Sequence, residues 1–115
     1  MNTENLQTLA LEAIDDLKAL NVATYDVRKI TSIADTMIIC SGTSNRHVRS
    51  IAENVVKKAK EAQIKHVRME GENEGEWVIV DLTDVIVHVM LPATREFYSL
   101  EELWQPVEKL RKTQR

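Results

Sequence analysis

Apolar residues recur along the first part of the chain at the spacing of one helix face. They follow the pattern i, i+3, i+4, i+7 and fall at Leu6, Leu9, Ala10, Ala13, Ile14, Leu17 and Leu20. This spacing predicts an amphipathic helix whose buried side is the apolar stripe. Asn2 or Thr3 suits the N-cap of this helix, and Asn21 suits the left-handed position that ends one.

A second amphipathic helix is predicted to follow the polar stretch 41–44. The last residue of that stretch, Ser44, suits a helix N-cap. The apolar stripe that follows consists of Val48, Ile51, Ala52, Val55, Val56 and Ala59. Opposite charges lie four residues apart on the other side, as at Arg49 and Glu53, which is typical of a helix face in water.

Five further segments have the patterns of strands. Residues 25–30 and 66–70 alternate between apolar and polar side chains, as half-exposed strands do. Residues 37–40 form a continuous apolar run, which is typical of a strand buried on both faces. Residues 77–80 and 85–91 are rich in β-branched side chains, and the short polar stretch between them predicts a hairpin.

Short helical segments are predicted after the last strand. Pro92 ends that strand, because its ring nitrogen has no hydrogen to donate to a neighbouring strand. Thr94 suits the N-cap of a helix that runs through Tyr98. Ser99 and Glu102 then form a capping-box pattern, which predicts one more helical turn.

The predicted elements follow the order α-β-β-α-β-β-β-α. The strand–helix–strand crossover in the middle joins parallel strands, whereas the hairpin is antiparallel. The chain is therefore predicted to be a single α/β domain with a mixed five-stranded sheet and helices mainly on one face. This domain is expected to span residues 1–104, and the polar residues 105–115 are expected to form a flexible tail.

Composition narrows the class of protein. The chain has 115 residues, which is enough for one hydrophobic core. Its single cysteine, Cys40, excludes an internal disulfide and fits a reducing compartment. No apolar run approaches the length of a membrane-spanning helix, and the first residues lack the pattern of a signal peptide. The net charge of −3 provides no general attraction for nucleic acid. These features predict a cytoplasmic protein that does not bind a membrane.

The last two strands present two different sets of side chains. One set is Val78, Val80, Val85, Val87 and Val89, and the other is Trp77, Ile79, Ile86, His88 and Met90. Helices on one side of the sheet can cover only one set. The set with Trp77 is predicted to form an exposed apolar patch, which is typical of a protein interface. The alternative is that the segment around Phe97, Tyr98 and Trp104 folds back over this patch.

Two patterns near turns are weak candidates for binding a ligand. At the helix start near Gly42, Arg46, His47 and Arg49 could hold a phosphate, but one glycine falls short of a phosphate-binding loop. An ordinary capped helix start is the favoured interpretation. Asp81 and Asp84 could hold a divalent metal. They flank the predicted hairpin turn, however, where aspartate commonly stabilises the turn itself.

Cys40 paired with His47, His66 or His88 would combine a nucleophile with a base. Cys40 ends an apolar run, however, where cysteine is typically a small buried hydrophobe. The histidines also lack the spacing of a zinc site.

The second predicted helix carries Arg46, Arg49, Lys57, Lys58 and Lys60. Its interleaved glutamates and lack of aromatic residues favour a solvated helix face over an RNA-binding face.

Four stretches together resemble a known family. Residues 32–48, 70–72, 77–89 and 95–104 read SIADTMIICSGTSNRHV, EGE, WVIVDLTDVIVHV and REFYSLEELW. In this order they resemble the ribosomal silencing factor S family, also called the Iojap family, over residues 5–104. The resemblance implies a protein without enzymatic activity that binds the intersubunit face of the large ribosomal subunit. Its partner there would be the ribosomal protein numbered fourteen.

The resemblance also implies a mechanism. A bound family member blocks joining of the small subunit and so represses translation when nutrients are scarce, and relatives have a role in assembly of the large subunit. No cofactor or metal is expected. Basic residues at the end of the chain, Lys109, Arg111, Lys112 and Arg115, either touch ribosomal RNA incidentally or belong to a flexible tail. Whether the protein is a monomer or a homodimer stays open.

The implied contact residues lie on the predicted exposed sheet face and around it. Trp77 is the expected aromatic anchor. The other expected contacts are Ile79, His88 and Met90 beside it, Asp81 and Asp84 facing basic partner residues, and Arg95 and Tyr98 at the rim.

The family fold is similar to that of nucleotidyltransferases, so the alternative function is a nucleotide-binding enzyme that uses the junction from Gly42 to Arg49. Such enzymes pair a Gly-Ser turn with two carboxylates on the next strand that hold catalytic metals. In this chain the next segment, 50–53, belongs to a predicted helix, and Asp81 and Asp84 come too late. The catalytic carboxylate pair is therefore missing, and the resemblance favours a binding protein.

Overall fold

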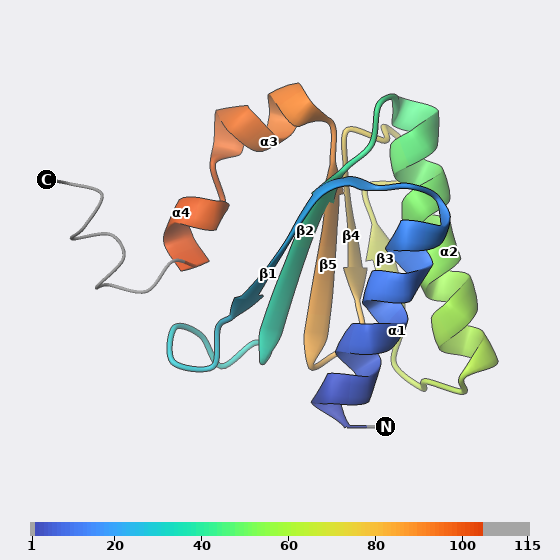
Figure 1. The fold of residues 1–115 in the computed structure, drawn as a ribbon, viewed down its shortest axis with the longest axis vertical. Coiled ribbons are helices and arrows are strands. Elements are labelled where there is room, and N and C mark those ends of the chain that lie inside the picture. Colours follow the sequence, from blue (N-terminus) through green and yellow to red (C-terminus); the bar gives the residue numbers. More distant parts are fainter. Residues whose placement is uncertain (1, 105–115) are drawn as a thin grey trace, which may run out of the picture.

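Five strands form one mixed sheet in the order β1-β2-β5-β4-β3 (Figure 1). The structure, a computed structural model, describes residues 2–104. The strands are β1 (Leu20–Asp26), β2 (Thr36–Ser41), β3 (Arg68–Glu70), β4 (Trp77–Asp81) and β5 (Val85–Met90). Strands β2 and β5 pair in parallel at the centre, and the other neighbours are antiparallel. The predicted α/β fold with a mixed five-stranded sheet is confirmed.

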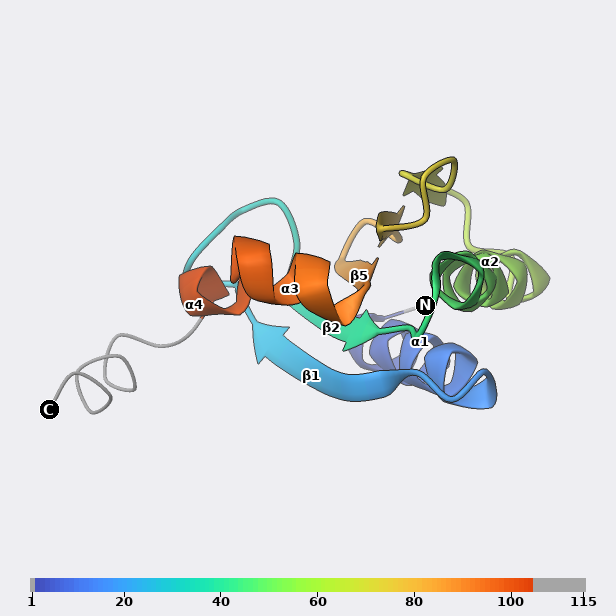
Figure 2. The ribbon, with the colours of Figure 1, turned by 90° about the horizontal axis from the view of Figure 1, so that it is seen from above.

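Two long helices, α1 (Thr3–Asp16) and α2 (Asn45–Glu61), cover one face of the sheet (Figure 2). Both begin at predicted caps, because the side chain of Asn2 accepts the N–H of Asn5 and that of Ser44 accepts the N–H of His47. Their apolar stripes pack on the valine set of the last two strands. The main core therefore lies between these helices and the sheet.

Two short helices, α3 (Pro92–Tyr98) and α4 (Glu101–Trp104), lie on the opposite side of the sheet (Figure 2). With Leu100 between them, they form what we call the cover. A second apolar cluster lies beneath it and contains Val27, Ala34, Met37, Ile39, Ile86, Met90 and Trp104. The long helices share one face as predicted, and the other face is covered as well. Among residues 2–104, no helix is both long enough and apolar enough to cross a membrane.

Several predicted boundaries are wrong for local reasons. Helix α1 stops at Asp16 because Lys18 takes a left-handed conformation with φ 59°, so Leu20 begins β1 instead of ending the helix. Strand β1 ends at Asp26, although 25–30 was the predicted span. Val27 is buried outside the sheet, and its carbonyl oxygen accepts the N–H groups of a tight turn. An alternation of apolar and polar residues indicates which side chains are buried. A side chain such as that of Val27 can be buried without belonging to a strand.

The start of α3 also differs from the prediction. Pro92 occupies its first turn and Leu91 is its N-cap residue, so Thr94 is not a cap. Ser99 ends α3 in a left-handed conformation with φ 49°. Its backbone carbonyl, not its side chain, accepts the N–H of Glu102. The expected extra turn forms as α4, without the side-chain bond of a capping box. The predicted tail, 105–115, lies outside the described residues.

Candidate functional site

The sheet face around Trp77 is covered, so the prediction of an exposed apolar patch there is wrong. Ile86, His88 and Met90 are all buried beneath the cover. Trp104 anchors α4 on this face and is itself only 8% exposed. His88 and Met90 therefore cannot touch a partner while the cover is in place. The alternative, in which the C-terminal segment folds back over the sheet, is what the structure shows.

The surface that remains exposed here is a row of three aromatic rings. The ring of Trp77, on β4, lies 4.9 Å from that of Tyr98, on α3, measured between centroids. The Tyr98 ring in turn meets the edge of Phe97 at 5.1 Å. Trp77 is half-buried, whereas Tyr98 is 52% and Phe97 81% exposed. We call these three residues the aromatic surface, because each step along it exposes more of a ring.

Beneath this surface, Trp77 is held in place by a buried histidine. The indole Nε1–H of Trp77 donates a hydrogen bond of 3.0 Å to Nδ1 of His88. The other face of the imidazole stacks toward Trp104 at 5.2 Å, and Trp104 contacts Tyr25 at 5.7 Å. Burial lowers the pKa of His88 to about 4, so the ring is neutral at pH 7 and Nδ1 is free to accept.

Acid is expected to destabilise the protein through His88. The unfolded chain binds a proton on this residue near pH 6.5, whereas the folded protein does so only near pH 4. Unfolding is therefore favoured as pH falls through this window, by about 3 kcal/mol at its lower end. Urea unfolding at a series of pH values measures the effect. His88→Gln should flatten the dependence, whereas exchanging the exposed His66 for glutamine should not. Parallel profiles for all three proteins would contradict the assignment to His88.

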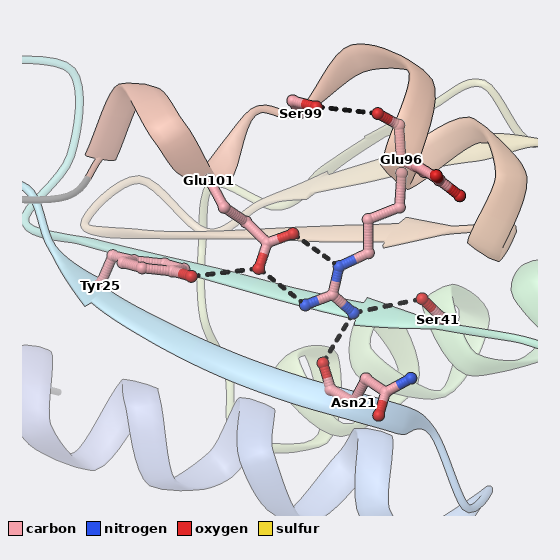
Figure 3. A network of polar contacts seen from close by, with 7 residues as sticks. Asn21, Tyr25, Ser41, Glu96, Ser99 and Glu101 are labelled. Carbon is pink, nitrogen blue, oxygen red and sulfur yellow. Dashed lines mark hydrogen bonds and ion pairs between the residues drawn. The ribbon is translucent and has the colours of Figure 1, made fainter. Parts of the chain in front are cut away.

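Arg95 ties the cover to the sheet (Figure 3). Its Nε and Nη2 donate to both carboxylate oxygens of Glu101 at 2.8 and 3.0 Å. Its Nη1 donates to the carbonyl of Asn21, on β1, at 2.7 Å and to Oγ of Ser41, on β2, at 3.2 Å. The side chain is only 13% exposed. Arg95 therefore has a structural role in this network, and a contact of its remaining exposed surface with a partner stays a prediction.

Glu101 is the acceptor at the centre of this network. Its hydrogen bonds from Arg95 hold the pKa of the carboxyl below its ordinary value. The Tyr25 hydroxyl also donates to Glu101, at 3.1 Å, and burial together with this bond raises the pKa of Tyr25. An ion pair with two parallel hydrogen bonds fixes geometry as well as charge. The network therefore sets the angle at which α3 and α4 lie against β1 and β2.

Asp81 and Asp84 lie at the hairpin, at the other end of β4 from the aromatic surface. One carboxylate oxygen of Asp81 accepts the backbone N–H of Thr83 at 2.8 Å, and the other accepts Nη2 of Arg68 at 3.1 Å. Thr83 has a positive φ of 79°, so the turn is tight and this aspartate supports it. The turn interpretation is confirmed for Asp81. Within residues 2–104, no group of three metal-ligating side chains gathers.

The cysteine and the helix junction both have structural roles. Burial raises the pKa of the Cys40 thiol to about 12, so it stays protonated and unreactive at neutral pH. At the start of α2, His47 accepts the N–H of Thr43 at Nδ1, and its Nε2 lies 2.7 Å from the carbonyl of Leu17. The N–H of Gly42 is bound by the carbonyl of Met90. With these groups in use, the capped junction is a better account than a phosphate site.

Phe97 is the exposed residue that sequence reasoning did not place at the interface. The sequence places it in a segment expected to cover the sheet, whereas in the structure it is 81% exposed. The available signal was a pair of adjacent aromatic residues, Phe97 and Tyr98, because a short helix cannot bury two neighbouring rings on one side. Of the predicted residues, the structure brings Trp77 and Tyr98 together and leaves Asp81 and Asp84 apart from them.

The chain matches a family model described as "Ribosomal silencing factor during starvation" over residues 1–115. It is 45% identical over 104 residues to a Chromobacterium violaceum protein named "Ribosomal silencing factor RsfS", covering 90% of this chain and 85% of that protein. A crystal structure of a Chromobacterium violaceum protein at 44% identity superposes with a TM-score of 0.88, covering 92% and 91% of the two chains. A mouse protein named "Mitochondrial assembly of ribosomal large subunit protein 1" is 40% identical over 73 residues, which is 61% of this chain and 32% of the mouse protein.

Proposed function

This chain belongs to the family of ribosomal silencing factors, and we propose that it silences ribosomes by binding the large subunit and blocking its union with the small subunit. The proposed partner on the large subunit is the ribosomal protein numbered fourteen. Repression would operate in the cytoplasm, under nutrient limitation. The protein would act by occupying a surface, with no bond made or broken.

The observation that carries this proposal is the aromatic surface. A largely exposed phenylalanine beside a half-exposed tyrosine that itself packs on a tryptophan is the composition that interface centres favour. Water-exposed rings of this kind lose hydration when a partner covers them, which favours binding. We assign Trp77, Tyr98 and Phe97 as the docking residues, with Ile79, which packs against the same apolar cluster as Trp77, as a further candidate.

Electrostatics adds a preference for basic partners at this surface. Glu96 and Glu102 are exposed on the cover, while its arginine, Arg95, is already paired with Glu101. Among the described residues, the cover therefore exposes two carboxylates that no ion pair of these residues neutralises. Carboxylates at an interface rim raise the rate of association with a positively charged patch. Asp81 and Asp84 stay candidates for a separate contact, because they lie at the far end of β4.

Steric exclusion follows from the size of the folded body. Its principal extents are 45, 32 and 20 Å. Even the smallest of these is several times the distance of about 4 Å at which side chains of two surfaces touch. A protein of this size that is bound where the subunits meet would keep them apart. Inhibition would then depend on occupancy, and so on affinity and cellular concentration.

Subunit association tests the proposal directly. Purified protein is added to separated ribosomal subunits, and the mixture is sedimented through a sucrose gradient. We expect the protein to migrate with the large subunit and the peak of joined ribosomes to shrink as protein is added. Migration with the large subunit without loss of joining would instead favour a role in large-subunit assembly, as the name of the mouse relative suggests for that protein. Failure to migrate with either subunit would overturn the proposal.

A further inference from the structure

Positive charge is concentrated at the end of the molecule opposite the cover. The segment 57–68 contains five cationic residues and one carboxylate, Glu61, so it carries a charge of +4 with His66 neutral. The whole chain carries −3, which leaves −7 for the rest. The segment comprises the last turns of α2 and the turn into β3, far from α3 in the fold (Figure 1). The negative net charge of the whole chain therefore coexists with a strongly positive charge on this segment.

The surface of this basic segment contains a depression. Lys65, His66, Val67, Arg68, Asp81 and Thr83 line a depression of about 410 Å³ between the start of β3 and the hairpin. Lys65, His66 and Arg68 are exposed there, and Lys57 and Lys60 are exposed on the adjoining turns of α2. We call these five residues the basic surface. Lys58 is not part of it, because it lies in a different hollow with Glu12 and Asp16 of α1.

The one acidic side chain in the hollow, Asp81, is largely occupied inside the protein. Its two oxygens accept hydrogen bonds from Arg68 and from the N–H of Thr83. The Arg68 side chain is 77% exposed, so much of its guanidinium still faces the solvent. Glu61 is also exposed here, and it is one of the glutamates that favoured a solvated face for α2 in the sequence. The four cations Lys57, Lys60, Lys65 and Arg68 nevertheless outnumber the two carboxylates, Glu61 and Asp81, so the surface keeps a net positive charge.

We propose that the basic surface binds the phosphate backbone of RNA without reading its sequence. The apolar residue that lines the hollow, Val67, is half-buried, so the hollow lacks the large exposed apolar anchor that a protein partner would need. The hollow also lacks Phe, Tyr and Trp, so charge provides most of the recognition and the phosphates are the groups recognised. This inference is independent of the proposed docking, because the two surfaces lie at opposite ends of β4. A protein held at its cover by a ribosomal protein could thus touch neighbouring RNA with its other end.

Fluorescence anisotropy with a labelled short RNA hairpin, unrelated in sequence to the ribosome, tests this proposal without ribosomes. With about three phosphate contacts on the duplex stem, affinity should fall about 40-fold between about 50 and about 200 mM KCl. The double variant Lys60→Glu with Lys65→Glu avoids the Arg68–Asp81 ion pair and should weaken binding strongly. It should also reduce the slope of log affinity against log salt by about 1 to 2. Arg68→Gln is a milder second variant and should give a smaller loss.

The matched control is Lys18→Glu with Lys29→Glu, which makes the same change in net charge away from the basic surface. Both residues are exposed, one after α1 and the other in the turn after β1. RNA affinity in the control should stay near that of the wild type, and circular dichroism should show all variants folded. An equal loss in both double variants would overturn the proposal, as would no binding by the wild type at the lower salt concentration. Tighter binding of a labelled polyglutamate than of RNA would also overturn it.

Discussion

Replacing Phe97 by alanine is expected to weaken binding to the large ribosomal subunit by about 30-fold, or about 2 kcal/mol, the size typical of an aromatic interface anchor. The ring is 81% exposed, so its removal takes little away from the folded state. The free energy of unfolding should change by no more than about 0.5 kcal/mol, as at other surface positions. Sedimentation with isolated large subunits over a range of protein concentrations measures the binding, and urea unfolding measures the stability.

Ile33→Ala is the matched control for Phe97→Ala. Ile33 is also a largely exposed apolar residue, at 70%, but it lies in the loop between β1 and β2. Its loss should leave binding at the level of the wild type. Undiminished binding by a folded Phe97→Ala protein would show that the aromatic surface is not the docking site. A loss of binding in both variants would mean that non-specific hydrophobic adsorption, and not a defined surface, holds the protein on the subunit.

Replacing Trp104 by alanine is expected to lower the free energy of unfolding by about 3 kcal/mol or more, the usual cost of emptying a buried tryptophan site. The ring fills the space between Tyr25 and His88 and is the buried anchor of α4. Without it, the cover would be held on the sheet by polar contacts and by the ring of Tyr98 against Trp77. The polar contacts are the hydrogen bonds of Arg95 to Asn21 and Ser41 and that of Tyr25 to Glu101. Urea unfolding gives the loss of stability, and binding of an apolar dye reports exposure of the sheet face.

Leu103→Ala is the control on the same short helix. Leu103 is 67% exposed, so its truncation should change stability by no more than about 0.5 kcal/mol. Because Phe97 and Tyr98 are part of the cover, Trp104→Ala should also weaken large-subunit binding. Leu103→Ala should leave the cover in place and so should not weaken binding by displacing these two rings. A Trp104→Ala protein as stable as the wild type would contradict the assignment of this residue as the anchor.

The elements that the sequence predicts best are those whose burial is repeated along the chain. The stripes from Leu6 and from Val48 each bury one side of a helix, and the β-branched run at 85–91 indicates the central strand. A repeated pattern averages over many contacts, so no single neighbour decides it. Boundaries depend on single residues instead. Helix α1 ends before the left-handed Lys18, and strand β1 ends before the buried Val27. At each boundary, the conformation or the burial of one residue decides where the element ends, whatever the hydrophobic pattern predicts.

The covered sheet face and the Arg95 network depend on contacts between distant parts of the chain. Alternation correctly grouped Trp77 with His88, and the two are hydrogen-bonded. It carries no information on whether Trp104 will lie over them. Arg95 looked like a surface residue because charged side chains usually are. Its partners come from β1, β2 and α4, and no local spacing brings these together. Candidate sites were therefore predictable as sets of residues, but not as exposed or buried.

The parallel pairing of β2 with β5 constrains the order in which the chain can fold. Thr36 lies opposite Val85, 49 positions later, so the centre of the sheet closes only after a long loop has been brought together. Pairings between distant segments of this kind form slowly, and the β4–β5 hairpin is the local contact available beforehand. During synthesis, the first half of the domain therefore has no completed sheet to join until β5 has left the ribosome. A protein proposed to act on large subunits thus completes its own sheet only after β5 has been made.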